Sequence, residues 1–324
     1  MALPTNTFSG YDAIGEREDL EDIIYNISPT DTPFTSMAAK VKARGVFHEW
    51  QTDSLAAAAT NTQLEGDDAT GNTLSATTRV GNYCQISRKV VVISGTLEAV
   101  DKAGRDSELS YQVAKAGKEL KRDMEYALTR NQASVAGSEA TARALGSIES
   151  WLPSATGNVV DGTGGTTAAY SSGVSAPTDA SSTNLITFTE ARLKTVIQAC
   201  WTDGGDPKVV MVGPANKKQA SAFNGIATLY RDTGTSMKQA SIIGAADVYV
   251  SDFGEHKIVA NRFSRDRTAL VLDMDYWAIA NLRPIQMIDI AKTGDSLKKE
   301  ILVEYTLVAR NFNASGKVAD LTTP

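Results

Sequence analysis

The sequence is poor in the residues that build metal centres and covalent frameworks. It contains two cysteines, Cys84 and Cys200, and two histidines, His48 and His256, among 324 residues. Two thiols are too few for a disulfide framework, and so few soft or imidazole ligands leave little for a zinc site. We therefore expect no disulfide scaffold, no metal and no cofactor.

Long apolar runs and a secretory leader are also missing. No run of eighteen apolar residues could span a bilayer, and the opening MALPTNTFSG lacks the basic patch and apolar stretch of a signal peptide. We expect a protein made and kept in a cytoplasm, with no membrane partner. The formal net charge of -6 opposes general attraction to phosphate backbones, so nearby DNA would be a neighbour rather than a specific ligand.

Glycine-rich stretches do not form a convincing phosphate site. GTGGTT at 162–167 lacks a third glycine, a preceding strand and a following helix. KVVMVGPANKK at 208–218 has a strand before Gly213, but it lacks the GK[ST] ending, and Pro214 suits the first turn of a helix. Both stretches are interpreted as ordinary turns.

The titratable residues give no catalytic signature either. His256 follows Glu255 in a predicted hairpin turn and is expected to be solvated, while His48 lies in an alternating strand without a nucleophile motif. Asp273 and Asp275 share one strand face, which fits a polar edge better than a cation site. We predict no catalytic, cofactor-binding or metal-binding residues, and therefore no enzyme.

The first part of the chain reads as an arm followed by a ribbon. GEREDLEDII predicts a short amphipathic helix, which SPTDTPF stops. Apolar and polar residues then alternate from Val46 to Gln51 and again over 82–93, separated by a segment rich in Ala, Thr, Asn and Gly. These runs predict a two-stranded ribbon with an extended tip, which should lie against another surface because isolated ribbons are marginal in water.

The next segment predicts a long helix over about 105–132. Its apolar line is narrow and consists of Leu109, Val113, Ala116, Leu120, Met124, Ala127 and Leu128. At about 1.5 Å per residue this helix would reach roughly 42 Å. Residues 133–150 lead to Trp151, and the segment that follows at 154–184 is low-complexity and is interpreted as a surface insertion or loop.

From residue 186 the pattern becomes α/β. We expect a helix over 187–202 capped by Thr187 or Thr189, a buried strand KVVMVG, a helix ANKKQASAF, and a hairpin that turns near Gly254. Strands follow at TALVLD, YWAIANL, IQMIDI and KEILVEYTLVARNF. The last would span roughly 46 Å, nearly the length of the long helix. The sequence thus predicts a flat plate in which each element has a single buried face, leaving surface that only neighbouring copies could cover.

The charges are distributed unevenly. From Gln51 to Thr78 there is no lysine or arginine, whereas the predicted helix has many cations. The acids of the ribbon tip are Asp53, Glu65, Asp67 and Asp68, and the helix carries Lys115, Lys118, Lys121 and Arg122 with Glu119, Asp123 and Glu125. Pairs at i to i+4 spacing, Lys115 with Glu119 and Lys121 with Glu125, favour a solvated face, while the asymmetry favours contact between copies; both alternatives stay open.

The order of these segments resembles that of the major capsid proteins of tailed bacteriophages. The resemblance spans the chain and rests on IIYNISPTDTPF, RALGSIESWL, KVVMVGPANKKQASAF, VYVSDFG, LRP and AKTGDSLKKEILVEYTLVARNFNASG. It implies an α+β chain with the Hong Kong 97 type capsid fold. On that basis residues 1–45 are an N-terminal arm, 46–93 an E-loop, 94–185 and 284–324 a P-domain with the spine helix, and 186–283 an α/β A-domain.

The resemblance also implies function and partners. We expect a virion protein that assembles into hexamers and pentamers of an icosahedral or prolate shell around packaged double-stranded DNA. Portal, separate scaffolding and decoration proteins are the other expected partners. Because such folds lay the E-loop over a neighbouring P-domain, Glu65, Asp67 and Asp68 are expected to meet Lys115, Lys118 or Arg122 of the next copy.

Departures from the family pattern and rival classes complete the expectation. No lysine lies between Lys42 and Lys89, so the resemblance predicts no isopeptide cross-link from the E-loop. Bacterial encapsulin shells are similar in fold and are the nearest alternative. A soluble α/β nucleotide-binding enzyme would need a phosphate loop and an acid or base in a pocket, and a tail or adhesion protein would need repeats.

Overall fold

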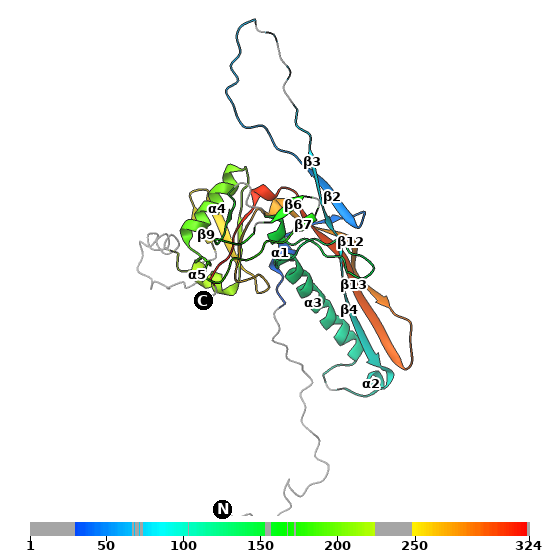
Figure 1. Cartoon of the computed structure of the whole chain (residues 1–324). Helices are drawn as coiled ribbons and strands as arrows, with labels where there is room; N and C mark the ends of the chain where they lie inside the picture. Colours follow the sequence, from blue (N-terminus) through cyan, green and yellow to red (C-terminus); the bar gives the residue numbers. More distant parts are fainter. Residues whose placement is uncertain are drawn as a thin grey trace, which may run out of the picture.

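The computed structural model describes residues 30–66, 68, 71, 74–102, 104–152, 157–166, 168–171, 173–223 and 248–322. Within these residues the chain is a mixed helix and sheet structure built on two main sheets, with a ribbon and its loop projecting from the body (Figure 1). The helix predicted in GEREDLEDII lies outside the described residues.

The first main sheet has four strands in the order β1-β12-β13-β4. Their bounds are Ala39–Lys42 for β1, Trp277–Asp289 for β12, Ser296–Ala309 for β13 and Gln85–Ser94 for β4. β12, β13 and β4 are antiparallel, whereas β1 joins the edge of β12 in parallel. The turn predicted at TGDS connects β12 to β13, and Gly294 adopts a positive φ of 79° there.

β12 corrects one prediction about this sheet. YWAIANL and IQMIDI were expected as two strands but form one strand with register shifts between Asn281 and Arg283 and between Arg283 and Gln286. Pro284 lies in this interval and has no N–H to donate to a ladder, so the chain bulges without leaving the sheet.

The projecting ribbon consists of β2, Phe47–Thr52, and β3, Thr78–Tyr83, paired antiparallel. The prediction that 46–51 pairs with all of 82–93 was wrong, because β4 pairs with β13 instead. Alternation assigns the faces of a strand but not its partner. The buried Asn82 stands at the change of partner, and its Nδ2 donates to the carbonyls of Gly146 (3.0 Å) and Leu307 (2.9 Å).

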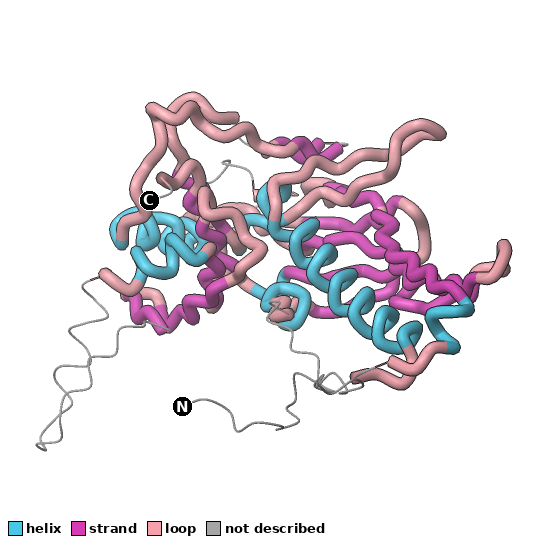
Figure 2. The backbone as a smooth tube through the Cα atoms, turned by 90° about the horizontal axis from the view of Figure 1, so that it is seen from below, coloured by secondary structure: helices cyan, strands magenta, loops and turns pink. Residues whose placement is uncertain are grey.

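The predicted long helix is present as α3, Glu108–Thr129, three residues shorter at each end than expected. Ser107 caps it by accepting a hydrogen bond from the amide of Ser110. The buried stripe lies where the sequence placed it, on Ala116, Leu120, Met124 and Leu128. α3 runs along one face of the four-stranded sheet (Figure 2), and the short helix α2, Gly95–Ala99, joins β4 to it.

The expectation of a single buried face fails for half of β13. Residues 296–300 are partly buried, whereas 301–309 are buried on both faces. One side of this second half faces the core under α3. The other meets a small cluster of Ala43, Cys84, Ala278, Ala280 and Val308, against which Trp50 of the ribbon packs. The plate is therefore thick at the base of the ribbon and thin at its far end.

The second main sheet has six strands in the order β5-β14-β11-β8-β10-β9. Their bounds are Val159–Val160 (β5), Gly316–Val318 (β14), Ala269–Leu272 (β11), Val209–Val212 (β8), Gly254–Ala260 (β10) and Val248–Ser251 (β9). The predicted helices are α4, Glu190–Thr202, and α5, Pro214–Ala220. Thr189, not Thr187, caps α4 by accepting from the amide of Arg192.

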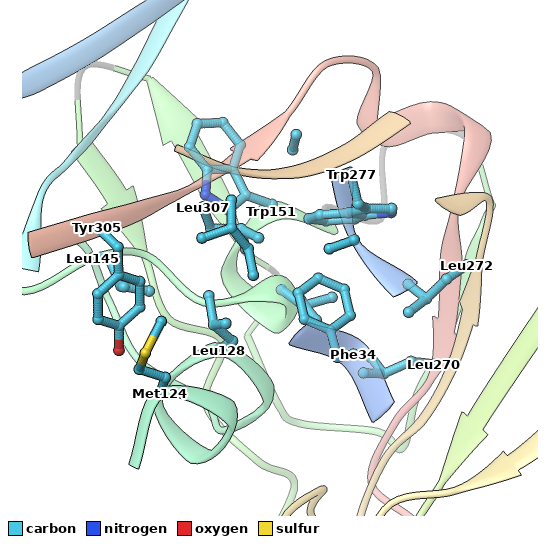
Figure 3. Packing of buried hydrophobic residues seen from close by; sticks show 14 of the residues in the cluster. Phe34, Met124, Leu128, Leu145, Trp151, Leu270, Leu272, Trp277, Tyr305 and Leu307 are labelled. Atoms are coloured by element: carbon cyan, nitrogen blue, oxygen red, sulfur yellow. The ribbon is translucent and has the colours of Figure 1, made fainter. Parts of the chain in front are cut away.

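Two buried clusters meet across this second sheet. Val210, Val212, Ala269 and Val271 pack with α4, whereas Met211, Leu270 and Leu272 join the core beneath α3. Figure 3 shows Leu270 and Leu272 beside Phe34 and Trp277. The rings of Phe34 and Trp277 pack edge to face, with their centroids 6.4 Å apart. Because β11 contributes to both clusters, the two sheets share one continuous interior.

The start of the described chain is part of this interior. α1, Pro33–Met37, carries the fully buried Phe34, and β1 follows it directly onto the sheet edge. Other short elements are β6, Ala169–Ser171, paired with β7, Gly173–Ser175, and 3₁₀ turns at Ile148–Trp151, Met274–Tyr276 and Phe312–Ala314. The low-complexity segment is tied down by Asp320, whose carboxylate accepts from the amides of Gly162 (3.1 Å) and Ala180 (2.8 Å).

Candidate subunit interface

The loop between β2 and β3 is the most exposed part of the described chain. Its three large apolar side chains are almost fully open to solvent: Leu55 is 98% exposed, Leu64 81% and Leu74 91%. Glu65 and Asp68 in the same loop are also exposed. A loop with apolar side chains and acids but no core of its own gains stability only where another surface covers it.

The base of this loop is held firmly. Asn82 satisfies all of its hydrogen-bonding atoms, because its Oδ1 accepts from the amide of Gly146 (2.8 Å) and the hydroxyl of Ser134 (3.1 Å) while its Nδ2 donates to two backbone carbonyls. Glu49 on β2 pairs with Arg79 on β3 at 2.5 Å across the ribbon. The loop therefore projects from a base in a fixed position.

A groove runs between α3 and β4 on the opposite part of the molecule. It has a volume of about 450 Å³. Its lining residues are Lys89, Val90, Val91, Val92, Ile93 and Leu97 from β4 and α2, and Glu108, Gln112, Lys115, Ala116 and Glu119 from α3. β4 is the edge strand of its sheet, and its residues 89–93 form one wall of this groove.

The structure separates the predicted contact residues of one copy. Glu65 and Asp68 are exposed in the loop, Asp67 lies outside the described residues, and Lys115 lines the groove. Within the described part of the chain no ion pair joins the loop acids to Lys115, Lys118 or Arg122. For Glu65 and Asp68, the structure of one copy therefore provides no such contact.

Lys118 and Arg122 lie on the outer side of α3 rather than in the groove. Lys118 is exposed, whereas the guanidinium of Arg122 lies 5.6 Å from the ring centroid of Phe263. The predicted pair between Lys121 and Glu125 is wrong, because the buried Glu125 accepts hydrogen bonds from Phe34, Thr35 and Asn261. Asp123 pairs with Lys89 of β4 at 2.8 Å, which links the helix to the edge strand.

His256 corrects another prediction, since its side chain is buried rather than solvated. Its Nδ1 lies 2.5 Å from the carbonyl of Pro207 and its Nε2 lies 2.7 Å from the hydroxyl of Ser251. Burial lowers the pKa of His256, so the ring is held neutral. β10 pairs with β9, and the ring of His256 lies inside the fold, stacked on Tyr249. The nearness of His256 to a turn in the sequence could not reveal this burial.

The other candidate chemical groups also have structural roles. Burial raises the pKa of Cys84 to about 11 and that of Cys200 to about 12, so both thiols stay protonated and unreactive. Asp273 does not share a strand face with Asp275 but caps the 3₁₀ turn by accepting from the amide of Asp275. Gly213 and Pro214 begin α5 beside Asp266, whose Oδ1 lies 3.5 Å from the amide of Ala215, so an acid faces the helix start.

A buried group of charges lies where the low-complexity segment meets the six-stranded sheet. Glu149 pairs with Arg265 at 2.9 Å, and Lys317 donates to the backbone carbonyl of Glu149 at 3.0 Å. Burial raises the pKa of Glu149 and lowers that of Lys317. The cavity they border, about 10 Å³, has room for one water at most. Such a closed cluster stabilises a junction and admits no substrate.

Among the described residues, no cluster of His, Cys, Asp or Glu could hold a metal ion. In the same ranges, none of the helices has the length and apolar character needed to cross a bilayer.

The three exposed leucines and the edge position of β4 were not predicted from the sequence. Leu55, Leu64 and Leu74 are isolated in a stretch of small polar residues, and that isolation was the available signal. The groove could not be found from the sequence because it depends on β4 leaving the ribbon for the sheet. Exposed apolar anchors, a projecting loop and an uncovered groove define a structural subunit of a larger assembly.

Comparison with known proteins gives this class its family. The family model of the SU10 major capsid protein matches residues 3–322. The major capsid protein of Escherichia phage Phieco32 is 31% identical, with 98% of this chain and 100% of that protein covered. The chain belongs to the SU10 major capsid protein family. It is a phage major capsid protein, a structural component of the virion capsid and not an enzyme.

Solved structures show the same fold at low sequence identity. The chain aligns with the capsid asymmetric unit of Cyanophage A-1(L) with a TM-score of 0.65, 13% identity, and 97% and 98% of the two chains covered. The capsid of a native GTA particle gives a TM-score of 0.61 at 12% identity, with 97% of each chain covered. An encapsulin complex from Synechococcus elongatus PCC 7942 gives 0.56 at 10% identity, with 95% and 93% covered. The phage capsid fold is thus shared, and the family match favours the phage shell over the encapsulin alternative.

Proposed function

We propose that copies of this chain assemble as hexamers and pentamers of an icosahedral or prolate shell that encloses packaged double-stranded DNA. Solved neighbours of the chain are capsid assemblies, one of which, from Phage G, includes decoration proteins. Portal, separate scaffolding and decoration proteins are the proposed further partners. The DNA would be a non-specific neighbour, in keeping with the net charge of -6.

We propose the domain division that the resemblance implied, with one adjustment. Residues 1–45 would form the arm, 46–93 the E-loop, 94–185 and 284–324 the P-domain, and 186–283 the A-domain. β4 falls within the E-loop range, yet it shares a sheet with β12 and β13, so we group it with the P-domain.

The loop of one copy is proposed to lie over α3 and β4 of the next copy. The observation that carries this proposal is the presence of three exposed leucines in an acidic loop and of an uncovered groove whose lining combines Val90, Val92 and Leu97 with Lys89 and Lys115, beside Glu108 and Glu119. Burying one leucine side chain stabilises an interface by about 1.5–3 kcal/mol, whereas an exposed ion pair contributes about 0–1 kcal/mol. The leucines would thus supply affinity, and Glu65, Asp67 and Asp68 facing Lys115, Lys118 or Arg122 would set register.

A charge exchange between the two surfaces tests this contact. Glu65→Lys with Asp68→Lys in one variant, and Lys115→Glu with Lys118→Glu in another, should each lower the yield of closed shells seen by electron microscopy. The four substitutions combined should restore the yield, because attraction between copies is regained. Lys257→Glu, at an exposed position on β10 in the other sheet, is a control that should leave assembly unchanged.

The apolar part of the contact has a separate test. Replacing Leu55, Leu64 and Leu74 with Ser should leave the unfolding midpoint of the unassembled chain unchanged but prevent or weaken shell formation. If the triple serine variant forms normal shells, the three leucines do not contribute to the contact between copies. If the combined charge exchange does not restore assembly, the loop acids and the lysines of α3 do not set the register of the contact.

A further inference from the structure

Glu125 is a buried acid without a cationic partner. It lies in the last turns of α3 with 0% relative exposure, and no lysine or arginine of the described chain forms an ion pair with it. A buried carboxylate is costly unless other groups satisfy its oxygens. Asp123, two residues earlier, shows the ordinary alternative, since it is exposed and pairs with Lys89.

Four hydrogen-bond donors surround the carboxylate. Oε1 accepts from the amide of Phe34 (2.8 Å) and from Nδ2 of Asn261 (2.7 Å). Oε2 accepts from the amide (2.8 Å) and the hydroxyl (2.5 Å) of Thr35. Three segments distant in sequence therefore meet at one side chain: the start of the described chain, the long helix and the residue after β10.

The first turn of α1 has no cap from its own chain segment. Thr32 occupies the N-cap position of α1, but its side chain makes no capping hydrogen bond. The amides of Phe34 and Thr35 belong to the unpaired donors at a helix start, which an acid is well suited to satisfy. Glu125 supplies that acid from another helix, and Phe34 fixes the contact by entering the core beside Trp277.

We propose that Glu125 is the positioning residue for the N-terminal segment. By capping α1 across the fold, it holds residues 30–38 on the body of their own copy. This goes beyond the shell role, because it keeps α1 and β1 with their own subunit during assembly.

Hydrogen exchange on the unassembled full-length chain tests the proposal. Glu125→Gln retains the size of the side chain but presents an NH₂ group to donors. The hydrogen-bonded amides of residues 30–38 should therefore exchange at least about tenfold faster, namely those of Phe34, Thr35, Ser36 and Ala38. Exchange within β13 should change by less than about twofold, since a positioning role is local. Asp123→Asn is the matched control and should leave residues 30–38 protected.

A rescue variant separates capping from simple packing. Thr32→Asp gives α1 a cap of its own, so Thr32→Asp combined with Glu125→Gln should recover most of the protection at Phe34 and Thr35. The same rescue applies if Glu125→Gln alone folds poorly, because the double variant should then fold. Unchanged exchange in Glu125→Gln, equal acceleration in β13, or absence of rescue would each overturn the proposal.

Discussion

β11 and β4 both contain several apolar residues, but only β11 is buried on both faces by its own chain. All four residues of β11 are buried, with Ala269 and Val271 facing α4 and Leu270 and Leu272 facing the core under α3. β4 alternates along its length, and Val90 and Val92 are 48% and 55% exposed. Strand propensity alone thus does not tell whether the covering surface belongs to the same copy.

This difference indicates which strands are stabilised within one copy and which have a face that only a neighbouring copy could cover. Three strands of the six-stranded sheet, β14, β11 and β8, are buried along their whole length within their own copy, whereas Val248 and Val250 on the edge strand β9 are half-exposed. The far part of the four-stranded sheet has α3 on one side and no cover of its own on the other among the described residues. Substitutions should therefore act on folding in the first region and on assembly in the second.

The largest expected effect is in β11. Leu270→Ala removes a side chain with 0% exposure and leaves a cavity, so the free energy of unfolding should fall by about 2–5 kcal/mol. Urea unfolding of the unassembled chain measures this. Val92→Ala on β4 is the matched control and should change the free energy by less than about 0.5 kcal/mol. Equal losses of unfolding free energy in the two variants would contradict the difference proposed between β11 and β4.

An intermediate effect is expected from His256 at the other side of the six-stranded sheet. Burial lowers its pKa from the ordinary value of 6.5, while the Pro207 carbonyl and Asp206 partly oppose this. The unfolded chain therefore takes up a proton more readily, and stability that is full above about pH 6.5 is lost as the pH falls through that value. His256→Gln should flatten the decline of the melting temperature between pH 7 and 5.5.

His48 on the ribbon provides the control for this pH dependence. Burial also lowers its pKa, but the side chain is only partly buried. His48→Gln should flatten the pH profile less than His256→Gln. A larger effect from the ribbon histidine would show that the ribbon, not the six-stranded sheet, dominates acid sensitivity.

The smallest effect in the unassembled chain is expected at Val90. Val90→Ser exchanges a half-exposed apolar side chain for a polar one, so unfolding of the lone chain should change by less than about 0.5 kcal/mol. Shells of this variant should melt at a lower temperature than wild-type shells, because the groove is then covered by a neighbour. An identical melting temperature would exclude Val90 from the interface and confine the contact to the rest of the groove.

Local periodicity predicted most elements of the fold. The stripe of Leu120, Met124 and Leu128 predicted α3, the apolar spacing of Leu193, Val196, Ile197 and Cys200 predicted α4 with its cap left open between Thr187 and Thr189, and Gly254 marked the turn of the β9 and β10 hairpin. These signals lie within a few residues of each other and depend on backbone preference and a single buried face. The loop acids were found in the same way, from a stretch without basic residues.

The features that escaped prediction depend on partners distant in sequence. Alternation in β4 did not reveal β13 as its neighbour, and an i to i+4 acid and base did not reveal that Glu125 would turn to Phe34 instead of Lys121. His256 was placed in solvent because the carbonyl of Pro207 is far from it in sequence. The groove shares this origin, since its two walls come from separate segments.

The two borders of the four-stranded sheet differ in a way that affects aggregation. One border is blunted, since β1 covers Ala278–Asn281 of β12 and the bulge around Pro284 interrupts the remainder of that edge. The other border, β4, is regular over ten residues. With a ten-residue border at β4 and only a four-residue border at β1, strand-to-strand contact between newly made chains is expected to join β4 to β4, which favours pairs over extended fibres.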